Sequence, residues 1–352
     1  MRRLLKTAGK ILALIAIAFI GFLVYATIKD FNPEPVSVIS RSSHPNVLTI
    51  DSADLNISLL SWNIGYCGLN KEMDFFYSGG KQVYPEKDVV ERNVEGVKDF
   101  LLKNHGVDFI MLQEVDVDSR RSYHINEKEI FENALGDYHS YYGVNYRVTY
   151  VPVPLSKPMG GVESGVVTFS QKVPALSERH SFEGNFAWPK RLFMLDRCFL
   201  VNRYKTSRGN DLVLINTHNS AYDKGELKAR QMQQLKSFLL SEYSKGNYVI
   251  VGGDWNQCPP GFKADFQNDK MDNIRRTDIP ADYIKGWTWA FDNSSPTNRR
   301  NKTAYRRGET PTTVIDFFLL SPNIRKKSVK NIDLGFDFSD HQPVLAEFTL
   351  IY

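Results

Sequence analysis

An apolar run at residues 248–251 leads directly into Gly-Gly-Asp-Trp-Asn at residues 252–256. The run predicts a buried strand, and we expect the two glycines to let the backbone turn sharply after it. Asp254 and Asn256 follow one residue apart, a spacing that places both side chains on one face of a strand. Asp254 can orient or deprotonate a water, and Asn256 can donate to a phosphoryl oxygen. Taken alone, the motif also fits an ordinary turn.

Polar residues stand at the ends of other apolar runs in the same way. Strands are expected at residues 57–63, 108–113, 165–169, 193–204, 212–217, 314–320 and 344–350, and helices at residues 88–103 and 226–243. The polar residues at or beside these strand ends are Asn63, Glu114, His218, Asp254, Asn256, Asp340 and His341. Strand ends gather along one rim of a layered α/β fold, so we expect one site there. Asp316 lies inside its apolar run, where a buried acid needs a partner.

Six short motifs cover most of the chain in a fixed order. They are Ser-Trp-Asn (61–63), Leu-Gln-Glu-Val (112–115), Asn-Thr-His (216–218), Gly-Asp-Trp-Asn (253–256), Ile-Asp-Phe (315–317) and Ser-Asp-His (339–341). In this order they resemble the endonuclease/exonuclease/phosphatase superfamily, which has the DNase-I-like fold, over about residues 57–352. The resemblance implies a four-layered sandwich of two mostly antiparallel β-sheets flanked by helices. It also implies hydrolysis of phosphate esters with a divalent cation, Mg²⁺ or Mn²⁺.

The resemblance further implies a metal site. Glu114 would be the main ligand of the cation, with Asn63 and Asp340 beside it. Mg²⁺ takes hard oxygen ligands, keeps several waters and needs few protein carboxylates, so this small set is chemically reasonable. A cation held there would polarise a phosphoryl oxygen and stabilise the leaving oxygen.

The resemblance assigns catalytic roles to the remaining polar residues. Asp254 and Asn256 would position the attacking water and a phosphate oxygen. His341, oriented by Asp316, would act as a general acid or base, because an Asp–His pair fixes the tautomer and favours the imidazolium. His218 would stabilise the developing charge from the other side of the phosphate. Family members differ in whether the aspartate or a histidine deprotonates the water, and both assignments stay open here.

A charge-free apolar segment at residues 11–28 follows a basic N-terminus. Its 18 residues are roughly the minimum for a spanning helix, and the basic flank predicts that the remaining chain faces the extracytoplasmic side, periplasmic or extracellular. We expect a signal anchor over residues 1–29, a linker rich in proline and serine over residues 30–55, and the catalytic domain over residues 56–352. The alternative is a secreted enzyme whose signal peptide is cleaved after the small residue Ala26.

The substrate class is open between several alternatives. Residues 1–30 carry the whole net charge of +4, so residues 31–352 are neutral, which argues against broad nucleic-acid affinity. The anchor and the aromatic-rich residues 66–84 and 138–150 favour a lipid-headgroup phosphodiester, as in sphingomyelinases. The family at large favours a nucleic acid, with the arginine-rich residues 299–307 as a collar for phosphate. An inositol phosphate or other phosphomonoester, and a catalytically inactive phosphate-binding module, are further alternatives.

Overall fold

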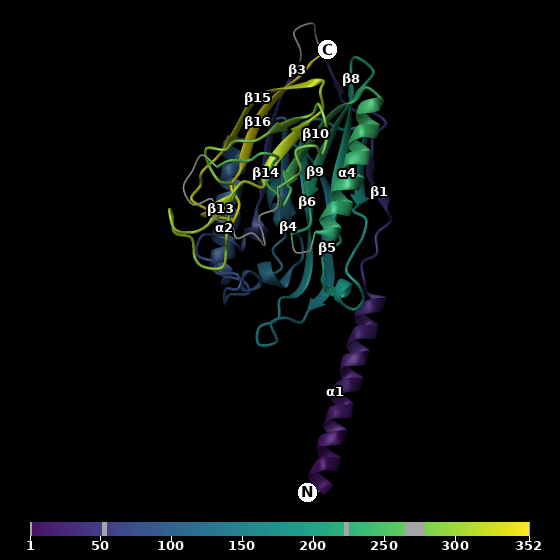
Figure 1. The fold of residues 1–352 in the computed structure, drawn as a ribbon, viewed down its shortest axis with the longest axis vertical. Helices are drawn as coiled ribbons and strands as arrows, with labels where there is room; N and C mark the ends of the chain where they lie inside the picture. Colours follow the sequence, from purple (N-terminus) through teal and green to yellow (C-terminus); the bar gives the residue numbers. More distant parts are fainter. Residues whose placement is uncertain (1, 51–54, 222–224, 265–277, 352) are drawn as a thin grey trace.

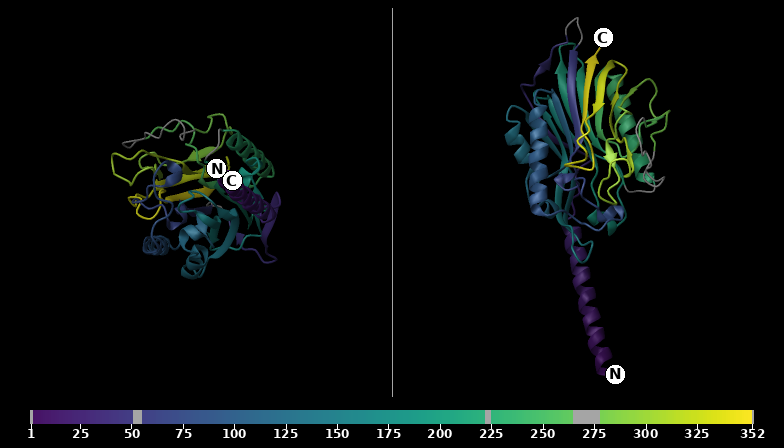
Figure 2. Two further views of the ribbon diagram at one scale, coloured as in Figure 1. Left: turned by 90° about the horizontal axis from the view of Figure 1, so that it is seen from below. Right: turned by 90° about the vertical axis from the view of Figure 1, so that its left-hand side faces the viewer.

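Two β-sheets pack face to face at the centre of the domain, and helices cover their outer faces in this computed structural model (Figures 1 and 2). The structure describes residues 2–50, 55–221, 225–264 and 278–351. The helices are α1 (Arg2–Ile28), α2 (Lys87–Lys103), α3 (Glu127–Ala134) and α4 (Glu226–Ser244), and the 3₁₀ turns are η1 (Gly65–Cys67), η2 (Phe76–Ser78), η3 (Arg120–Ser122) and η4 (Lys190–Phe193). The strands are β1 (Val36–Arg41), β2 (Val47–Leu48), β3 (Leu55–Asn63), β4 (Phe109–Asp116), β5 (His139–Val151), β6 (Gly160–Ser170), β7 (Leu176–Ser181), β8 (Cys198–Thr206), β9 (Asp211–His218), β10 (Tyr248–Asp254), β11 (Thr288–Ala290), β12 (Asn298–Arg299), β13 (Thr312–Thr313), β14 (Asp316–Leu320), β15 (Ile324–Asn331) and β16 (Val344–Leu350).

The strand order agrees with the predicted fold class. The first sheet runs β1-β7-β8-β9-β10-β14-β11, with β2 paired to β8, and the second runs β15-β16-β3-β4-β6-β5. Most neighbours are antiparallel, while β3–β4, β9–β10 and β2–β8 are parallel. A parallel pair needs a crossover connection, and α2 and α4 supply it for β3–β4 and β9–β10. The prediction of two mostly antiparallel sheets flanked by helices is confirmed.

Apolar side chains hold these layers together. Between the two sheets, inward-facing residues of both meet in one cluster, including Leu59, Leu214 and Phe348. Helix α2 covers the outer face of the second sheet with the apolar stripe Val90, Val94, Val97 and Leu101. Helix α4 covers the first sheet with Met232, Leu235 and Leu239. The spacing of three and four residues within each stripe is that of an amphipathic helix with one buried face.

Several strands differ from their predicted positions or are missing from the prediction. The strand expected at residues 193–204 begins only at Cys198, because η4 redirects the chain and Arg179 holds the carbonyl of Asp196 with a 2.9 Å hydrogen bond. The long strand β5 is missing from the prediction. Its sequence mixes tyrosines with polar residues and lacks a clear apolar alternation, although Tyr141 and Tyr146 are buried.

The prediction for the N-terminal segments also needs one correction. Helix α1 projects from the domain (Figures 1 and 2), and in the described parts of the chain it is the helix long and apolar enough to cross a membrane. The predicted linker at residues 30–55 is not a free spacer, since β1 pairs with β7 and β2 with β8. A sheet edge offers unpaired backbone groups, and these residues satisfy them. Residues 51–54 of that linker lie outside the described residues.

Candidate active site

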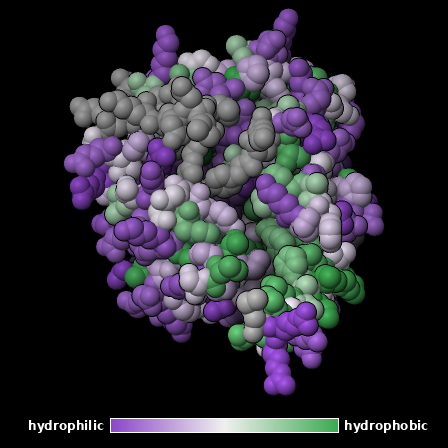
Figure 3. Space-filling model, turned by 60° about the horizontal axis from the view of Figure 1, so that its bottom comes forward, coloured by the Kyte–Doolittle hydropathy of each residue, from purple (hydrophilic) through white to green (hydrophobic). Residues whose placement is uncertain are grey.

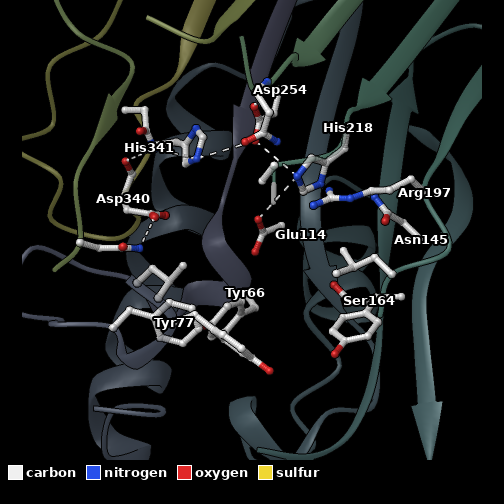
Figure 4. Close-up of a pocket in the computed structure, with 18 of the residues that line it drawn as sticks. Tyr66, Tyr77, Glu114, Asn145, Ser164, Arg197, His218, Asp254, Asp340 and His341 are labelled. Atoms are coloured by element: carbon white, nitrogen blue, oxygen red, sulfur yellow. Dashed lines mark hydrogen bonds and ion pairs between the residues drawn. The ribbon is translucent and has the colours of Figure 1, made fainter. Parts of the chain in front are cut away.

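The predicted side chains come together at the end of the sheets that also carries α1 (Figures 1 and 4). Strands β9 and β10 end side by side at His218 and Asp254, and β14 starts opposite Asp254 at Asp316. A cavity of about 400 Å³ opens there, and the predicted residues that line it are Glu114, His218, Asp254, Asn256, Asp340 and His341. Asn63 and Asp316 lie behind these residues and reach them by hydrogen bonds.

Glu114 reaches the cavity from a β-bulge. Strand β4 continues to Asp116, so the prediction that the strand stops before Glu114 is wrong. The pairing of β4 with β6 shifts between Leu112 and Val115, and Glu114 adopts a left-handed backbone conformation with φ of 53°. A bulge re-aims one side chain within a strand. Here the bulge points the side chain of Glu114, which is 24% exposed, into the cavity.

The two glycines before Asp254 serve packing and make no turn. Strand β10 runs through Gly252 and Gly253 to Asp254, so the expected sharp turn is wrong. Gly253 has φ of 132°, and a Cβ atom there would lie 2.1 Å from the carbonyl oxygen of Thr217 on β9. Glycine therefore lets β10 approach β9 closely at this point. The chain turns afterwards, where Asp254 Oδ1 accepts a 2.8 Å hydrogen bond from the backbone N–H of Asn256.

His341 and Asp316 form a buried pair. The Nδ1 atom of His341 lies 2.8 Å from Oδ2 of Asp316, and its Nε2 atom lies 3.8 Å from Oδ2 of Asp254. Burial alone would lower the pKa of His341, but the charges of Asp316 and Asp254 raise it to about 10. Burial raises the pKa of Asp254 to about 6, against the opposing charge of His341. The imidazolium is therefore favoured, with a carboxylate on each side.

His218 approaches the same carboxylate from the opposite side (Figure 4). Its Nε2 atom lies 3.4 Å from Oδ2 of Asp254 and 3.8 Å from Oε1 of Glu114. Burial lowers the pKa of His218 well below its usual value, and the positive charge of Arg197 lowers it further. A neutral imidazole is favoured, which can donate one hydrogen bond into the cavity without carrying a charge.

The side-chain amide of Asn63 bridges the carboxylates of Glu114 and Asp254. Its Nδ2 group donates to Oδ2 of Asp254 at 3.0 Å and to Oε1 of Glu114 at 3.2 Å. Its Oδ1 atom accepts a 3.0 Å hydrogen bond from the backbone N–H of Gly65. In this orientation the amide fixes both acids in place. A role for Asn63 as a direct metal ligand stays a prediction.

The acids at the cavity fit a divalent cation. Asp340 Oδ2 accepts a 2.7 Å hydrogen bond from Asn301, while Oδ1 is buried and has no hydrogen-bond partner among the residues described. Burial raises the pKa of Asp340 to about 6. Since an unsatisfied buried carboxylate oxygen is unfavourable, a hard cation would complete this site together with Glu114.

A second group of potential ligands lies beside this site. Asp254, Asp316 and His341 are also close enough to one another to hold a metal ion. The short hydrogen bond between His341 and Asp316, however, already occupies the imidazole nitrogen that faces Asp316. That nitrogen is therefore not free to bind a cation, whereas Glu114 and Asp340 offer carboxylate oxygens, the ligands that a hard cation prefers.

Two asparagines of the site are absent from the sequence-based prediction. The side-chain amide of Asn298 lies 3.0 Å from Nε2 of His341, and Asn301 holds Asp340. Both belong to the arginine-rich residues 299–307 or their flank. Arg299 is buried and donates to backbone carbonyls, among them those of Leu69 and Met73 at 3.3 Å each. It fixes the loop around the site, and a role of residues 299–307 as a collar for phosphate stays a prediction.

Aromatic and apolar side chains form the other wall of the cavity. The aromatic-rich segments contribute Tyr66, Phe75, Tyr77 and Tyr146, and Met159, Phe193, Met194 and Leu195 extend the same wall. Arg121 stacks on Tyr66, with 3.6 Å between the guanidinium carbon and the ring centroid. Its guanidinium also binds Asp116 through two hydrogen bonds of 2.8 and 3.0 Å. Arg121 therefore supports the wall, and the cavity is charged at one end and apolar at the other.

Two packed β-sheets with acids, amides and histidines gathered at one rim define the class of DNase-I-like folds. The family model described as "Endonuclease/Exonuclease/phosphatase family" matches residues 60–341, and the chain belongs to this family. The members of this family are phosphoester hydrolases. A search of curated protein sequences finds no significant match.

Solved structures of low sequence identity share the fold. An endonuclease/exonuclease/phosphatase from Beutenbergia cavernae aligns with a TM-score of 0.58 at 15% identity and covers 84% of this chain and 72% of its own. D. rerio TDP2 complexed with single strand DNA product aligns with a TM-score of 0.52 at 14% identity, covering 84% and 99%. The structure of ANGEL2, described as a 2',3'-cyclic phosphatase, in complex with adenosine-2',3'-vanadate aligns with a TM-score of 0.53 at 16% identity. The alignment covers 90% of this chain and 100% of the ANGEL2 chain.

Proposed function

We propose that the protein is a divalent-metal-dependent phosphodiesterase, which α1 anchors in a membrane with its catalytic domain on the extracytoplasmic side. The observation that carries this proposal is the line from Asp316 through His341 to Asp254, buried beside the free carboxylate oxygen of Asp340. It combines a charged imidazole, a carboxylate with a raised pKa and an oxygen site for a hard cation in one cavity. Each of these three elements is suited to one part of phosphodiester hydrolysis: the carboxylate to the attacking water, the imidazolium to the leaving oxygen and the cation to the phosphoryl oxygen.

The proposed reaction adds water to phosphorus and breaks one P–O ester bond. Glu114 and Asp340 would hold Mg²⁺ or Mn²⁺, which supplies polarisation of a phosphoryl oxygen when bound. Asp254, with a pKa raised to about 6, is suited to orient the water and take its proton. His341, with a pKa raised to about 10, is suited to stabilise the developing negative charge and to donate a proton to the leaving oxygen.

Two neutral groups complete the proposed binding of the phosphate. Asn256 lines the cavity beside Asp254, and its Nδ2 group donates a 2.9 Å hydrogen bond to the carbonyl of Asn219, so its second N–H is the one suited to donate to a phosphoryl oxygen. His218 lies across the cavity from His341 and is favoured in its neutral form, so it offers a hydrogen bond without repelling the cation. Together they would fix the phosphoryl group between the attacking water and the leaving oxygen.

The apolar wall supports a lipid-headgroup diester as the substrate. A phosphodiester with an apolar tail matches a cavity that is charged at one end and lined by Phe75, Tyr77, Phe193 and Leu195 at the other. Among the arginines at the cavity, Arg121 is paired with Asp116 and Arg299 binds backbone carbonyls. The neutral charge of residues 31–352 agrees with a substrate that is not strongly anionic.

A nucleic acid is the second candidate. The specific observation in its favour is Arg197, which lines the cavity next to His218 and Asn145 (Figure 4). A guanidinium at this position suits a second phosphate of a polynucleotide. The structurally similar TDP2 carries a single strand DNA product, although its 14% identity establishes the fold alone.

A parallel assay separates these substrates. The full chain in nanodiscs, supplied with Mg²⁺, would be offered choline-labelled sphingomyelin in the same disc and plasmid DNA in solution. We expect release of the water-soluble label, loss of that release in His341→Ala, and full release in His105→Ala, which removes a histidine from a surface pair with Asp137. Cleavage of DNA alone would favour the second candidate. Equal release by His341→Ala would refute the assignment of the site.

A further inference from the structure

The last turns of α1 are packed against the catalytic domain. The ring of Phe22 stacks on Phe193 of η4 with 6.0 Å between centroids, and it meets Tyr150 of β5 edge to face at 6.2 Å. Ala26, one turn further along the helix, is buried in the same contact. The helix therefore leaves the domain at a defined place, next to the ends of β5 and η4.

Polar contacts fix the point where α1 ends. Trp188 Nε1 donates a 3.2 Å hydrogen bond to Oγ1 of Thr27, and Arg191 lies 3.4 Å from Asp30 as an ion pair. A tryptophan beside the last turn of a spanning helix is typical of the boundary between the hydrocarbon and the headgroups. If α1 crosses a bilayer, these contacts place the domain directly on the surface of that bilayer.

The same face of the domain exposes large apolar side chains. Leu155 is 87% exposed in the short loop that follows β5, Trp188 is 55% exposed, and Val153 is 40% exposed. Lys157 and Lys190 flank them and are suited to lipid phosphates. Seen from this side, the hydrophobic surface is concentrated on α1 and beside it (Figure 3). Exposed apolar residues gathered next to a spanning helix indicate contact with the membrane interface.

The cavity is continuous with this face. Phe193 contacts Phe22 of α1 and also lines the cavity. Met159, at the end of the loop that carries Leu155, lines the same cavity. The backbone N–H of Met159 donates a 3.2 Å hydrogen bond to the carbonyl of Val153, which ties the exposed loop to the cavity wall. One stretch of apolar surface thus runs from the base of α1 into the site.

We propose that the face bearing Val153, Leu155 and Trp188 rests in the headgroup region of the bilayer that α1 crosses. The catalytic cavity opens on that bilayer and receives the phosphodiester of a membrane lipid along its apolar wall, without the lipid leaving the membrane. The docking of this face is independent of the chemistry, whereas cleavage of a lipid diester there rests on the proposed phosphodiesterase function. The partner is a lipid surface, recognised by apolar insertion beside lysines.

Brominated lipid tests the docking directly. The chain has five tryptophans, of which Trp62, Trp255 and Trp287 are buried and Trp289 is packed against the core, so Trp188 is the one that can touch lipid. We expect the fluorescence of the full chain to be lower in nanodiscs of brominated phosphatidylcholine than in matched unbrominated discs. Trp188→Phe is expected to abolish this difference. Equal fluorescence of the unsubstituted chain in both discs would overturn the proposal.

A charge on the exposed loop tests the access of lipid. For the full chain in nanodiscs we compare the turnover of choline-labelled lipid with that of a soluble diester, bis(p-nitrophenyl) phosphate. Leu155→Glu is expected to lower the ratio of lipid to soluble turnover by about fivefold or more, since a carboxylate opposes insertion. The control Leu240→Glu, at a residue of α4 that is 43% exposed, is expected to keep the ratio.

The outcomes separate the two proposals. An unchanged ratio in Leu155→Glu would overturn the access of lipid through this face. Turnover of the soluble diester alone, with quenching of Trp188, would leave the docking face intact and overturn the lipid substrate. Turnover of neither substrate, again with quenching, would refute the phosphodiesterase function while the docking face stands.

Discussion

Nδ1 of His341 and Oδ2 of Asp316 lie 2.8 Å apart in the buried centre of the site, although the residues stand 25 positions apart in the chain. The carboxylate belongs to the first residue of β14 and the imidazole to the turn before β16, so each comes from a different sheet. The pair therefore joins the two halves of the sandwich where the reaction is proposed to take place. The other nitrogen of the imidazole faces Asp254.

Replacing the carboxylate of this pair should impair catalysis and leave the fold intact. Asp316→Asn keeps the shape but removes the charge that holds the proton on His341, so we expect kcat for bis(p-nitrophenyl) phosphate to fall about 10²- to 10⁴-fold. KM should change little. The matched control is Asp137→Asn, which alters an exposed Asp–His pair with His105. A kcat within about threefold of the unsubstituted chain would contradict the role of Asp316.

Removing the main metal carboxylate should weaken binding of the cation. We expect Glu114→Gln to lower the affinity for Mg²⁺ or Mn²⁺ by about tenfold or more, measured by calorimetry on the full chain without substrate. Asp340→Asn should act in the same direction, because Asp340 also lines the cavity and its Oδ1 atom has no hydrogen-bond partner among the described residues. Glu309→Gln, on a side chain that is 70% exposed, serves as the control. Equal affinity in all three variants would place the cation elsewhere.

The stability of the fold should depend on Glu242 at acid pH. Glu242 is buried on α4 and accepts two hydrogen bonds from Arg203, at 2.6 and 3.0 Å. Burial opposes ionisation, but Arg203 and Lys245 lower the pKa of Glu242 to about 2. A lowered pKa means that this stabilisation is complete above the unfolded pKa of 4.5 and is lost as the pH falls through about 2.

Glu242→Gln tests this dependence. At pH 7 we expect the variant to lower the unfolding free energy by about 2 kcal/mol, because Arg203 loses a charged hydrogen-bond acceptor. The difference between the variant and the unsubstituted chain should shrink below pH 4.5. Urea unfolding of both proteins over this range checks the prediction. A difference that does not vary with pH would show that the charge of Glu242 is not the cause.

The anchor predicts the size and the location of the mature chain. We expect a membrane-bound protein of the full 40.3 kDa that resists extraction by carbonate. All three native cysteines are buried, so Lys285→Cys adds an exposed thiol, which an impermeant maleimide should label in intact cells. A shorter, soluble product would show that the signal is cleaved. A full-length chain labelled only after lysis would reverse the orientation.

The fold could be predicted from the sequence where pattern and position coincide. Strands such as β9 and β10 are visible in the sequence as apolar runs. Their last residues, His218 and Asp254, are polar and indicate the edge of the sheet where the site lies. The bulge that presents Glu114 has no signature in the sequence, since it depends on the register of β4 against β6. The same is true of Gly253, whose role is set by the distance to the Thr217 carbonyl on the neighbouring strand.

Parts of the site that belong to loops were not predictable. Asn298 and Asn301 reach His341 and Asp340 across about forty residues of chain, and no periodic pattern marks them. Arginine is usually exposed at the surface, yet Arg299 is buried, because several backbone carbonyls accept hydrogen bonds from its guanidinium. Contacts of this kind arise from tertiary packing, which a single sequence does not display.

The most direct measurement is the turnover of bis(p-nitrophenyl) phosphate by the full chain in detergent, with Mg²⁺ and after its removal by EDTA. The proposed function predicts turnover that requires the cation, falls by about 100-fold or more in His341→Ala, and is unaffected in His105→Ala. Turnover that persists in EDTA, or that His341→Ala sustains at the rate of the unsubstituted chain, would contradict a metal-dependent phosphodiesterase built on this site.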